Sequence, residues 1–144
     1  MTSKSIQRRA APAVLGVAIS LLIAACASQS SPTPQATAAV RPSSPATITV
    51  KQPASGAQLS GTSVHVVLGI AGARIVPVTT TAIRPDEGHV HLYVNNALVS
   101  MNYGLEQDIA VTPGTYVLKA EFVAADHAPF NPRVWSAEVF FTVR

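Results

Sequence analysis

The chain has 144 residues, a length that suits one domain. Three of its ten Lys and Arg residues lie at positions 4, 8 and 9, which leaves seven basic against seven acidic residues from Cys26 onward. This balance removes the electrostatic basis for binding nucleic acid. Because Cys26 is the only cysteine, no internal disulfide can form, and the fold has to be stabilised by its hydrophobic core.

The first 25 residues have the features of an export signal. A basic stretch precedes an apolar run over residues 10–25, which is shorter than the roughly 20 residues of a membrane span and ends in small residues. The run closes on Leu22-Ile23-Ala24-Ala25-Cys26, which resembles the lipobox of bacterial lipoproteins. The resemblance implies cleavage before Cys26 and a diacylglycerol on its sulfur, which together anchor a protein stably. We therefore expect an exported protein held on the cell membrane or outer membrane by lipid on Cys26, with an uncleaved N-terminal anchor as the alternative.

Residues 26–46 are expected to be the lipidated cysteine and a disordered tether. The segment is rich in proline and serine and has no aromatic residue, so it cannot bury enough apolar area to offset its chain entropy. The predicted organisation is a signal peptide over residues 1–25, this linker, and a folded domain over residues 47–144.

From residue 47 the pattern predicts short β-strands separated by turns. The first strand is expected at 47–51, followed by a turn at 53–56, and the second at 63–70. Alternation in the second places Val64, Val66, Leu68 and Ile70 on the core face. A further short strand is expected at 74–78 and a loop at 79–88.

A hairpin is predicted around Asn95-Asn96, because asparagine tolerates the positive φ of a two-residue turn. A regular register would pair Leu92 with Val99 and Val90 with Met101. It would make one face of the hairpin wholly apolar. Met101, whose sulfur is a soft ligand suited to copper, would then lie in the core, away from the strand histidines.

The last part of the chain is predicted to form two long strands. Pro113 and Gly114 suit the centre of a type II turn, which opens a strand at 115–124. A loop at 125–133 and a final strand from Trp135, itself expected to fill the core, would complete the domain. In the first of these strands the expected core residues are Tyr116, Leu118, Ala120 and Phe122, with Lys119 and Glu121 outside. About six to eight such strands indicate an all-β, antiparallel, immunoglobulin-like β-sandwich.

Two sets of motifs resemble known families. Pro53-x-x-Gly56 with Gly61 resembles the opening of bacterial immunoglobulin-like modules. An H-x-H-L strand at 89–92, a P-G-T-x-x-L turn at 113–118 and a D-H-x-P loop at 126–129 resemble a family of small exported bacterial domains, over residues 88–143. That family often has a further histidine at the position of Tyr116, and the resemblance implies no particular activity.

The histidines are the main candidates for chemistry. His89 and His91 lie two apart on a predicted strand, so both side chains leave the same face, and His127 is the natural third member of a copper or zinc site. Asp126 could ligate the metal or orient an imidazole. The alternative is that these histidines are structural or contact a partner, and His65 is expected to be solvated.

No nucleophile elbow, phosphate loop or carboxylate pair is present in the sequence. The sequence therefore favours a non-enzymatic binding or accessory module of the cell envelope. Its partners would be the membrane, through the lipid, and an envelope protein or polymer. A copper-binding protein, with copper favoured over zinc, is the alternative, and an enzyme of unknown reaction is third.

Overall fold

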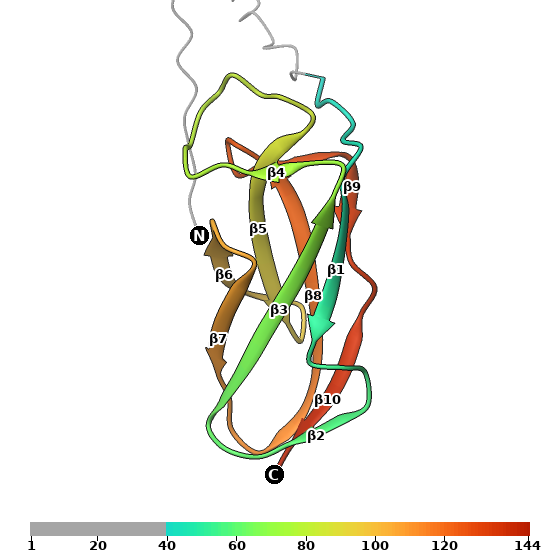
Figure 1. Cartoon of the computed structure of the whole chain (residues 1–144), viewed down its shortest axis with the longest axis vertical. Coiled ribbons are helices and arrows are strands. Elements are labelled where there is room, and N and C mark those ends of the chain that lie inside the picture. Colours follow the sequence, from blue (N-terminus) through green and yellow to red (C-terminus); the bar gives the residue numbers. More distant parts are fainter. Residues whose placement is uncertain (1–39) are drawn as a thin grey trace, which may run out of the picture. The chain divides into compact units, whose positions relative to one another are not determined.

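The computed structural model describes residues 40–144. The predicted signal peptide, the lipidation site Cys26 and most of the predicted linker lie outside this range. All regular secondary structure within residues 40–144 is β, and no helix there is long and apolar enough to cross a membrane. The all-β prediction is therefore confirmed for the described part of the chain (Figure 1).

The strands form two sheets that pack face to face. The smaller sheet has the order β1 (Thr47–Gln52), β3 (Ser63–Ala71), β7 (Glu106–Ala110). The larger sheet has the order β2 (Ala57–Leu59), β10 (Val139–Val143), β8 (Gly114–Ala124), β5 (Glu87–Val94), β4 (Arg74–Ile75), with β6 (Ala97–Asn102) on β5 and β9 (Pro129–Trp135) on β8. In Figure 1, β1 and β3 lie in front of β5 and β8.

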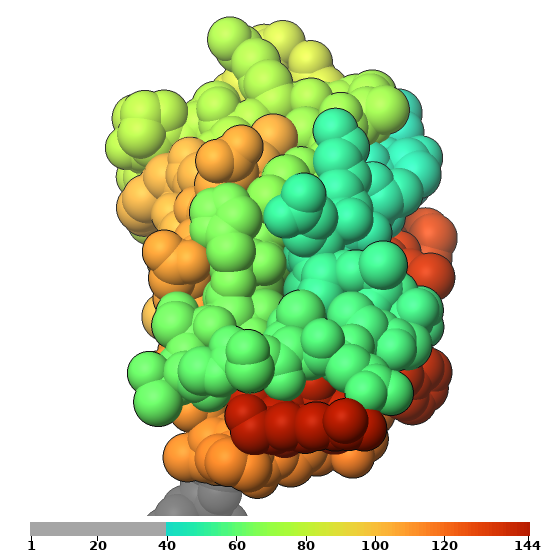
Figure 2. Space-filling model, turned by 60° about the horizontal axis from the view of Figure 1, so that its bottom comes forward, coloured from blue at the N-terminus to red at the C-terminus, as the bar shows by residue number. Residues whose placement is uncertain are grey.

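Antiparallel pairing dominates both sheets. Only the short pairs β2 with β10 and β4 with β5 are parallel within residues 40–144. Figure 2 shows the green β2 segment directly beside the red C-terminal strand β10.

The core lies between the sheets and follows from the alternation in the sequence. Val64, Val66 and Leu68 of β3 are buried on one side of the sandwich. On the other side Leu118, Ala120 and Phe122 of β8 are fully buried, as the period-2 pattern predicts. The predicted faces of these two strands are confirmed.

A tyrosine corner marks the fold as immunoglobulin-like. The Tyr116 hydroxyl donates to the Thr112 carbonyl oxygen at 2.7 Å and accepts from the Thr112 amide at 3.1 Å. This bond from the start of a strand to the backbone upstream is a hallmark of such sandwiches. The prediction of a type II turn here was wrong: Gly114 lacks the positive φ that the turn requires and is the first residue of β8.

The predicted hairpin is present, but its register differs from the prediction. Asn95 and Asn96 have φ of 50° and 65°, as a two-residue turn requires. A bulge then leaves Val99 without a partner, so Leu92 pairs with Ser100 and His91 with Met101. Met101 is 58% exposed, and its predicted place in the core was wrong.

Four features of the C-terminal half differ from the prediction. Strand β7 was not expected, and β9 occupies most of the predicted loop. The final strand begins at Val139 because Ser136 interrupts the pairing: its amide and Oγ bond to the backbone of Ala120 at 2.8 and 2.9 Å. Trp135 ends β9 opposite Glu121, on the outer face of the sheet, rather than filling the core.

Candidate functional site

The candidate site is built on the outer face of the larger sheet, where β5 presents its histidines. Val90 and Leu92 face the core, so His89 and His91 leave the other side of the strand. Gly88 lets β5 approach β8 closely, because a Cβ at that position would overlap the Val123 carbonyl oxygen. His89 is fully buried and His91 is only 6% exposed, so this outer face is covered rather than solvated.

His89 is held by backbone on both sides of its ring. Its Nδ1 lies 3.0 Å from the Val76 carbonyl oxygen and its Nε2 lies 3.0 Å from the Ala125 carbonyl oxygen. Carbonyl oxygens only accept hydrogen bonds, so each ring nitrogen faces an acceptor and neither points to open space. His89 therefore joins two loop segments, and in this conformation neither ring nitrogen is presented to a metal.

His127 lies over the same face of the sheet. It has a φ of 63°, and its amide bonds to the Ala124 carbonyl oxygen at 2.9 Å, which turns the loop back over the sheet. The ring centroid lies 4.2 Å from that of His89 and 5.7 Å from that of His91. A non-glycine residue in this backbone region is uncommon and often marks a functional loop.

The two rings that remain available meet at their nitrogens. His91 Nε2 and His127 Nδ1 are 3.4 Å apart. Two nitrogens bound to a tetrahedral metal at about 2.0 to 2.1 Å are separated by about 3.3 to 3.4 Å, so the observed spacing suits a shared metal as well as a weak hydrogen bond. Among residues 40–144, no three His, Cys, Asp or Glu side chains are arranged to hold a metal ion.

The environment favours the neutral form of both rings. Burial, with the nearby His127, holds the pKa of His91 below its ordinary value of 6.5. Burial, with the nearby His89, lowers the pKa of His127 in the same way. Neutral imidazole is the form that can ligate a metal.

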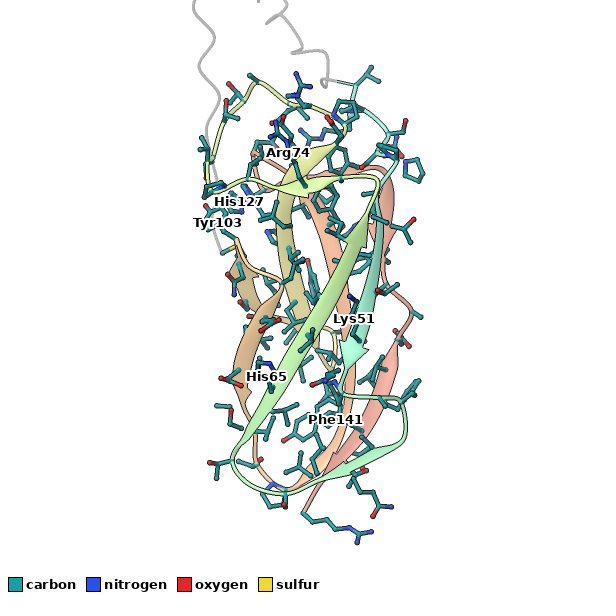
Figure 3. All side chains as sticks on the ribbon, viewed as in Figure 1. Lys51, His65, Arg74, Tyr103, His127 and Phe141 are labelled. Carbon is teal, nitrogen blue, oxygen red and sulfur yellow. The ribbon has the colours of Figure 1, made fainter. Side chains whose placement is uncertain are left out.

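The remaining nitrogen of His127 is oriented by two hydroxyl groups. Its Nε2 lies 3.1 Å from Thr79 Oγ1 and 3.4 Å from the Tyr103 hydroxyl. Figure 3 shows Tyr103 and His127 next to each other at one end of the domain. Such outer contacts fix the tautomer and the orientation of a ligating histidine. Neither residue was expected from the sequence, because Thr79 lies in a loop without a motif and Tyr103 follows the unforeseen bulge.

Asp126 does not point to the histidines. Its carboxylate accepts two hydrogen bonds from the Arg41 guanidinium, at 2.6 and 2.9 Å, which lower the pKa of the carboxyl group. Arg41 also donates to the carbonyl oxygens of Ala128 and Pro129 at 2.9 Å. The segment predicted as free tether is thus fixed to the domain from about residue 41 onward, and Arg41 positions the loop that carries His127.

A second cluster continues the outer face. Glu121, opposite His91 on β8, lies on the outer face as expected, but it is fully buried there rather than solvated. Its carboxylate accepts from Arg133 at 2.6 and 2.7 Å and from the Tyr93 hydroxyl at 3.3 Å. The Arg133 guanidinium also lies 4.5 Å from the centre of the Trp135 ring. This cluster holds β9 against β8, and the buried charge of Glu121 is paired with Arg133.

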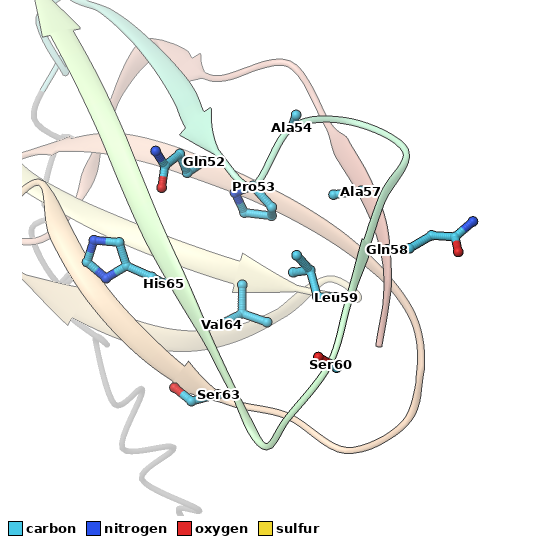
Figure 4. A pocket seen from close by; sticks show the side chains of 10 residues that line it. All are labelled: Gln52, Pro53, Ala54, Ala57, Gln58, Leu59, Ser60, Ser63, Val64 and His65. Carbon is cyan, nitrogen blue, oxygen red and sulfur yellow. The ribbon is translucent and has the colours of Figure 1, made fainter. Parts of the chain in front are cut away.

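A separate pocket of about 500 Å³ opens near the β1–β2 turn. Pro53, Leu59 and Val64 contribute apolar walls, and His65 lies at one side (Figure 4). His65 is half-exposed, and its Nδ1 lies 3.0 Å from Asp108 Oδ1. The side chain is solvated, as expected, and takes no part in the histidine cluster.

Strand β6 carries an unusual number of exposed apolar side chains. Leu98, Val99 and Met101 of β6, together with Tyr103 just after it, are here called the β6 strip, and all four are more than two-fifths exposed. Within the described residues β6 pairs with β5 alone, so its other edge has free backbone groups. Exposed apolar strips and open strand edges are typical of interaction sites.

No family model and no curated protein matches the chain. A search of solved structures finds a similarity to the fibronectin(III)-like modules of Clostridium thermocellum CbhA, with a TM-score of 0.49 and 19% sequence identity. The match covers 67% of this chain and 45% of that one, so the chain spans less than half the length of the structure it resembles.

Proposed function

We propose that the protein is a lipid-anchored, non-enzymatic binding module of the cell envelope that engages an envelope protein or polymer through the β6 strip. The observation that supports this proposal is the concentration of exposed apolar side chains on one strand edge. The lipobox-like sequence before Cys26 supports the anchor. An immunoglobulin-like sandwich suits such a role, because it presents a rigid strand edge.

Photocrosslinking in intact cells tests the surface. A photoreactive residue at position 99, in the β6 strip, is compared with one at position 58, which is exposed on β2. The expected result is a discrete adduct from position 99 that is lost when Leu98→Glu is added, and none from position 58. Equal adducts from both positions, or no adduct from position 99, would contradict the assignment of the surface.

The anchor has its own test. Cys26→Ser should block processing and abolish incorporation of labelled fatty acid, whereas the wild-type protein is processed and labelled. Equal labelling of the two proteins would rule out lipidation at Cys26.

A second candidate function is binding of copper by His91 and His127. The specific observation in its favour is the 3.4 Å spacing of two imidazole nitrogens. Titration of the full chain with Cu(I), in a Cys26→Ser background that removes the competing thiol, gives a direct measurement. His91→Ala and His127→Ala should each lose most of the affinity, and the matched control His65→Ala should lose none. No Cu(I) binding by the parent protein would end this proposal.

A further inference from the structure

We infer that Met101 is the third ligand of the candidate copper site, which is then a Cu(I) centre of two imidazoles and one thioether. This inference rests on the proposed copper-binding function and adds the ligand that sets its metal preference. It depends on the bulge in β6, which changes the face that Met101 occupies.

The bulge is the first step. The hairpin begins in regular register, with Val94 opposite Ala97 and Tyr93 opposite Leu98. The ladder then skips Val99, and from there on each β6 residue moves to the face opposite the one that a regular hairpin would give it. Met101 becomes the direct partner of His91. Directly paired residues have side chains on the same face, with Cα atoms about 4.5 to 5.5 Å apart.

Tyr103 gives independent support for this face. It lies two residues after Met101, at the bend that directly follows β6. The Tyr103 ring packs edge-on against His89 with 4.7 Å between centroids, and its hydroxyl lies 3.4 Å from His127 Nε2. The chain at the end of β6 therefore lies over the histidines, because Tyr103 contacts them two residues after Met101.

The other candidates for a third ligand are already engaged. The nitrogens of His89 face carbonyl oxygens, the Asp126 carboxylate is paired with Arg41, and the Glu121 carboxylate is paired with Arg133. Met101 remains, and more than half of its surface is exposed rather than packed in the core. Its thioether is thus free to take up a metal.

The donor set favours Cu(I). Thioether sulfur is a soft ligand that selects Cu(I), and imidazole suits copper as well as zinc. If the metal binds His127 Nδ1, the other nitrogen carries the proton and donates to Thr79 Oγ1 or the Tyr103 hydroxyl, which are already at hydrogen-bonding distance. These contacts would orient His127 without any rearrangement of its ring.

The test compares Cu(I) binding by the full chain in the Cys26→Ser background with that of Met101→Leu. Leucine conserves size at an exposed position, so the fold is expected to persist, as circular dichroism will check. Loss of an outer contact of a metal site typically costs 10- to 100-fold in affinity, so loss of a ligand should cost at least about 10-fold. X-ray absorption should show a sulfur neighbour of copper in the parent and none in Met101→Leu.

The outcomes separate the two levels of the proposal. If the parent binds no Cu(I), the copper function fails and the inference with it. If His91→Ala and His127→Ala lose binding while Met101→Leu keeps full affinity, or the parent shows no sulfur neighbour, the two-histidine site stands and the assignment of Met101 is overturned. Met101→His should bind metal more tightly than Met101→Leu and should prefer zinc over Cu(I) more than the parent does. If it does neither, the assignment of Met101 as a ligand is contradicted.

Discussion

Replacing Arg133 should destabilise the domain far more than its half-exposed position suggests. Arg133 pairs with Glu121, whose carboxylate is fully buried on the outer face of β8. In Arg133→Met the long apolar stem can still lie on Trp135, but the buried carboxylate has lost its main partner and keeps only the Tyr93 hydroxyl at 3.3 Å. Removing one member of a buried ion pair costs about 3 to 5 kcal/mol.

The lower end of that range applies, because Arg133 lies beside solvent and water can reach part of the carboxylate once the guanidinium is gone. A loss of about 3 kcal/mol lowers the melting temperature of a domain of roughly 100 residues by about 12 °C or more. The double variant Glu121→Leu with Arg133→Met removes both charges. It should recover to within about 1 kcal/mol of the parent, because an apolar replacement of a buried pair is often neutral.

Urea denaturation is the suitable assay, since guanidinium chloride would screen the charges being measured. The free energies of unfolding of the parent, both single variants and the double variant give a coupling energy. We expect a coupling of at least about 2 kcal/mol, with unchanged dependence on urea concentration. Additive losses in the double variant, or a loss below about 0.5 kcal/mol in Arg133→Met, would refute the view that a paired buried charge holds β9 on β8.

Other consequences follow from the core, the histidines and the loop. Phe122→Ala should cost about 3 to 5 kcal/mol in urea denaturation and the exposed control Phe140→Ala under about 1 kcal/mol; similar losses would mean that the strand faces are misassigned. The pKa values of His91 and His127 are lowered in the folded protein, so the unfolded state binds more protons and the free energy of unfolding should fall as pH drops below about 6.5. That slope should be reduced in His91→Gln, and an unchanged slope would contradict the burial of His91. Arg41→Ala should speed amide hydrogen exchange at Ala124 and His127, whose amides close the loop; exchange as slow as in the parent would show that Arg41 does not hold it.

The sequence predicts those parts of the fold that depend on local alternation. Val64, Val66 and Leu68, like Leu118, Ala120 and Phe122, repeat every second residue, and that period fixes a strand and its buried face together. The same reasoning places His89 and His91 on one face, and the Asn95-Asn96 pair fixes the turn. Strand β7 escaped prediction because its residues, Glu106-Gln107-Asp108-Ile109-Ala110, have little apolar alternation.

The remaining features depend on contacts that are distant in sequence. Nothing in the residues around Val99 distinguishes a bulge from a regular hairpin, and this one residue decides whether Met101 faces the core or the histidines. Glu121 resembles a solvated residue of an outer face until Arg133 on a neighbouring strand covers it. Asp126 looks like a metal ligand next to His127, and only the fold brings it Arg41, which lies 85 residues away.

If the chain is anchored upstream, the bond between Arg41 and Asp126 gives the domain a defined point of mechanical load. For a chain anchored upstream, any pull between the anchor and a bound partner enters the described part at Arg41. The guanidinium is tied there to the loop of His127, and the Pro42 carbonyl oxygen accepts from the Asn131 amide at 2.9 Å. Tension would therefore act on the histidine end and on β9 as well as on β1. The histidine cluster therefore lies next to the point where tension in the tether would be transmitted to the domain.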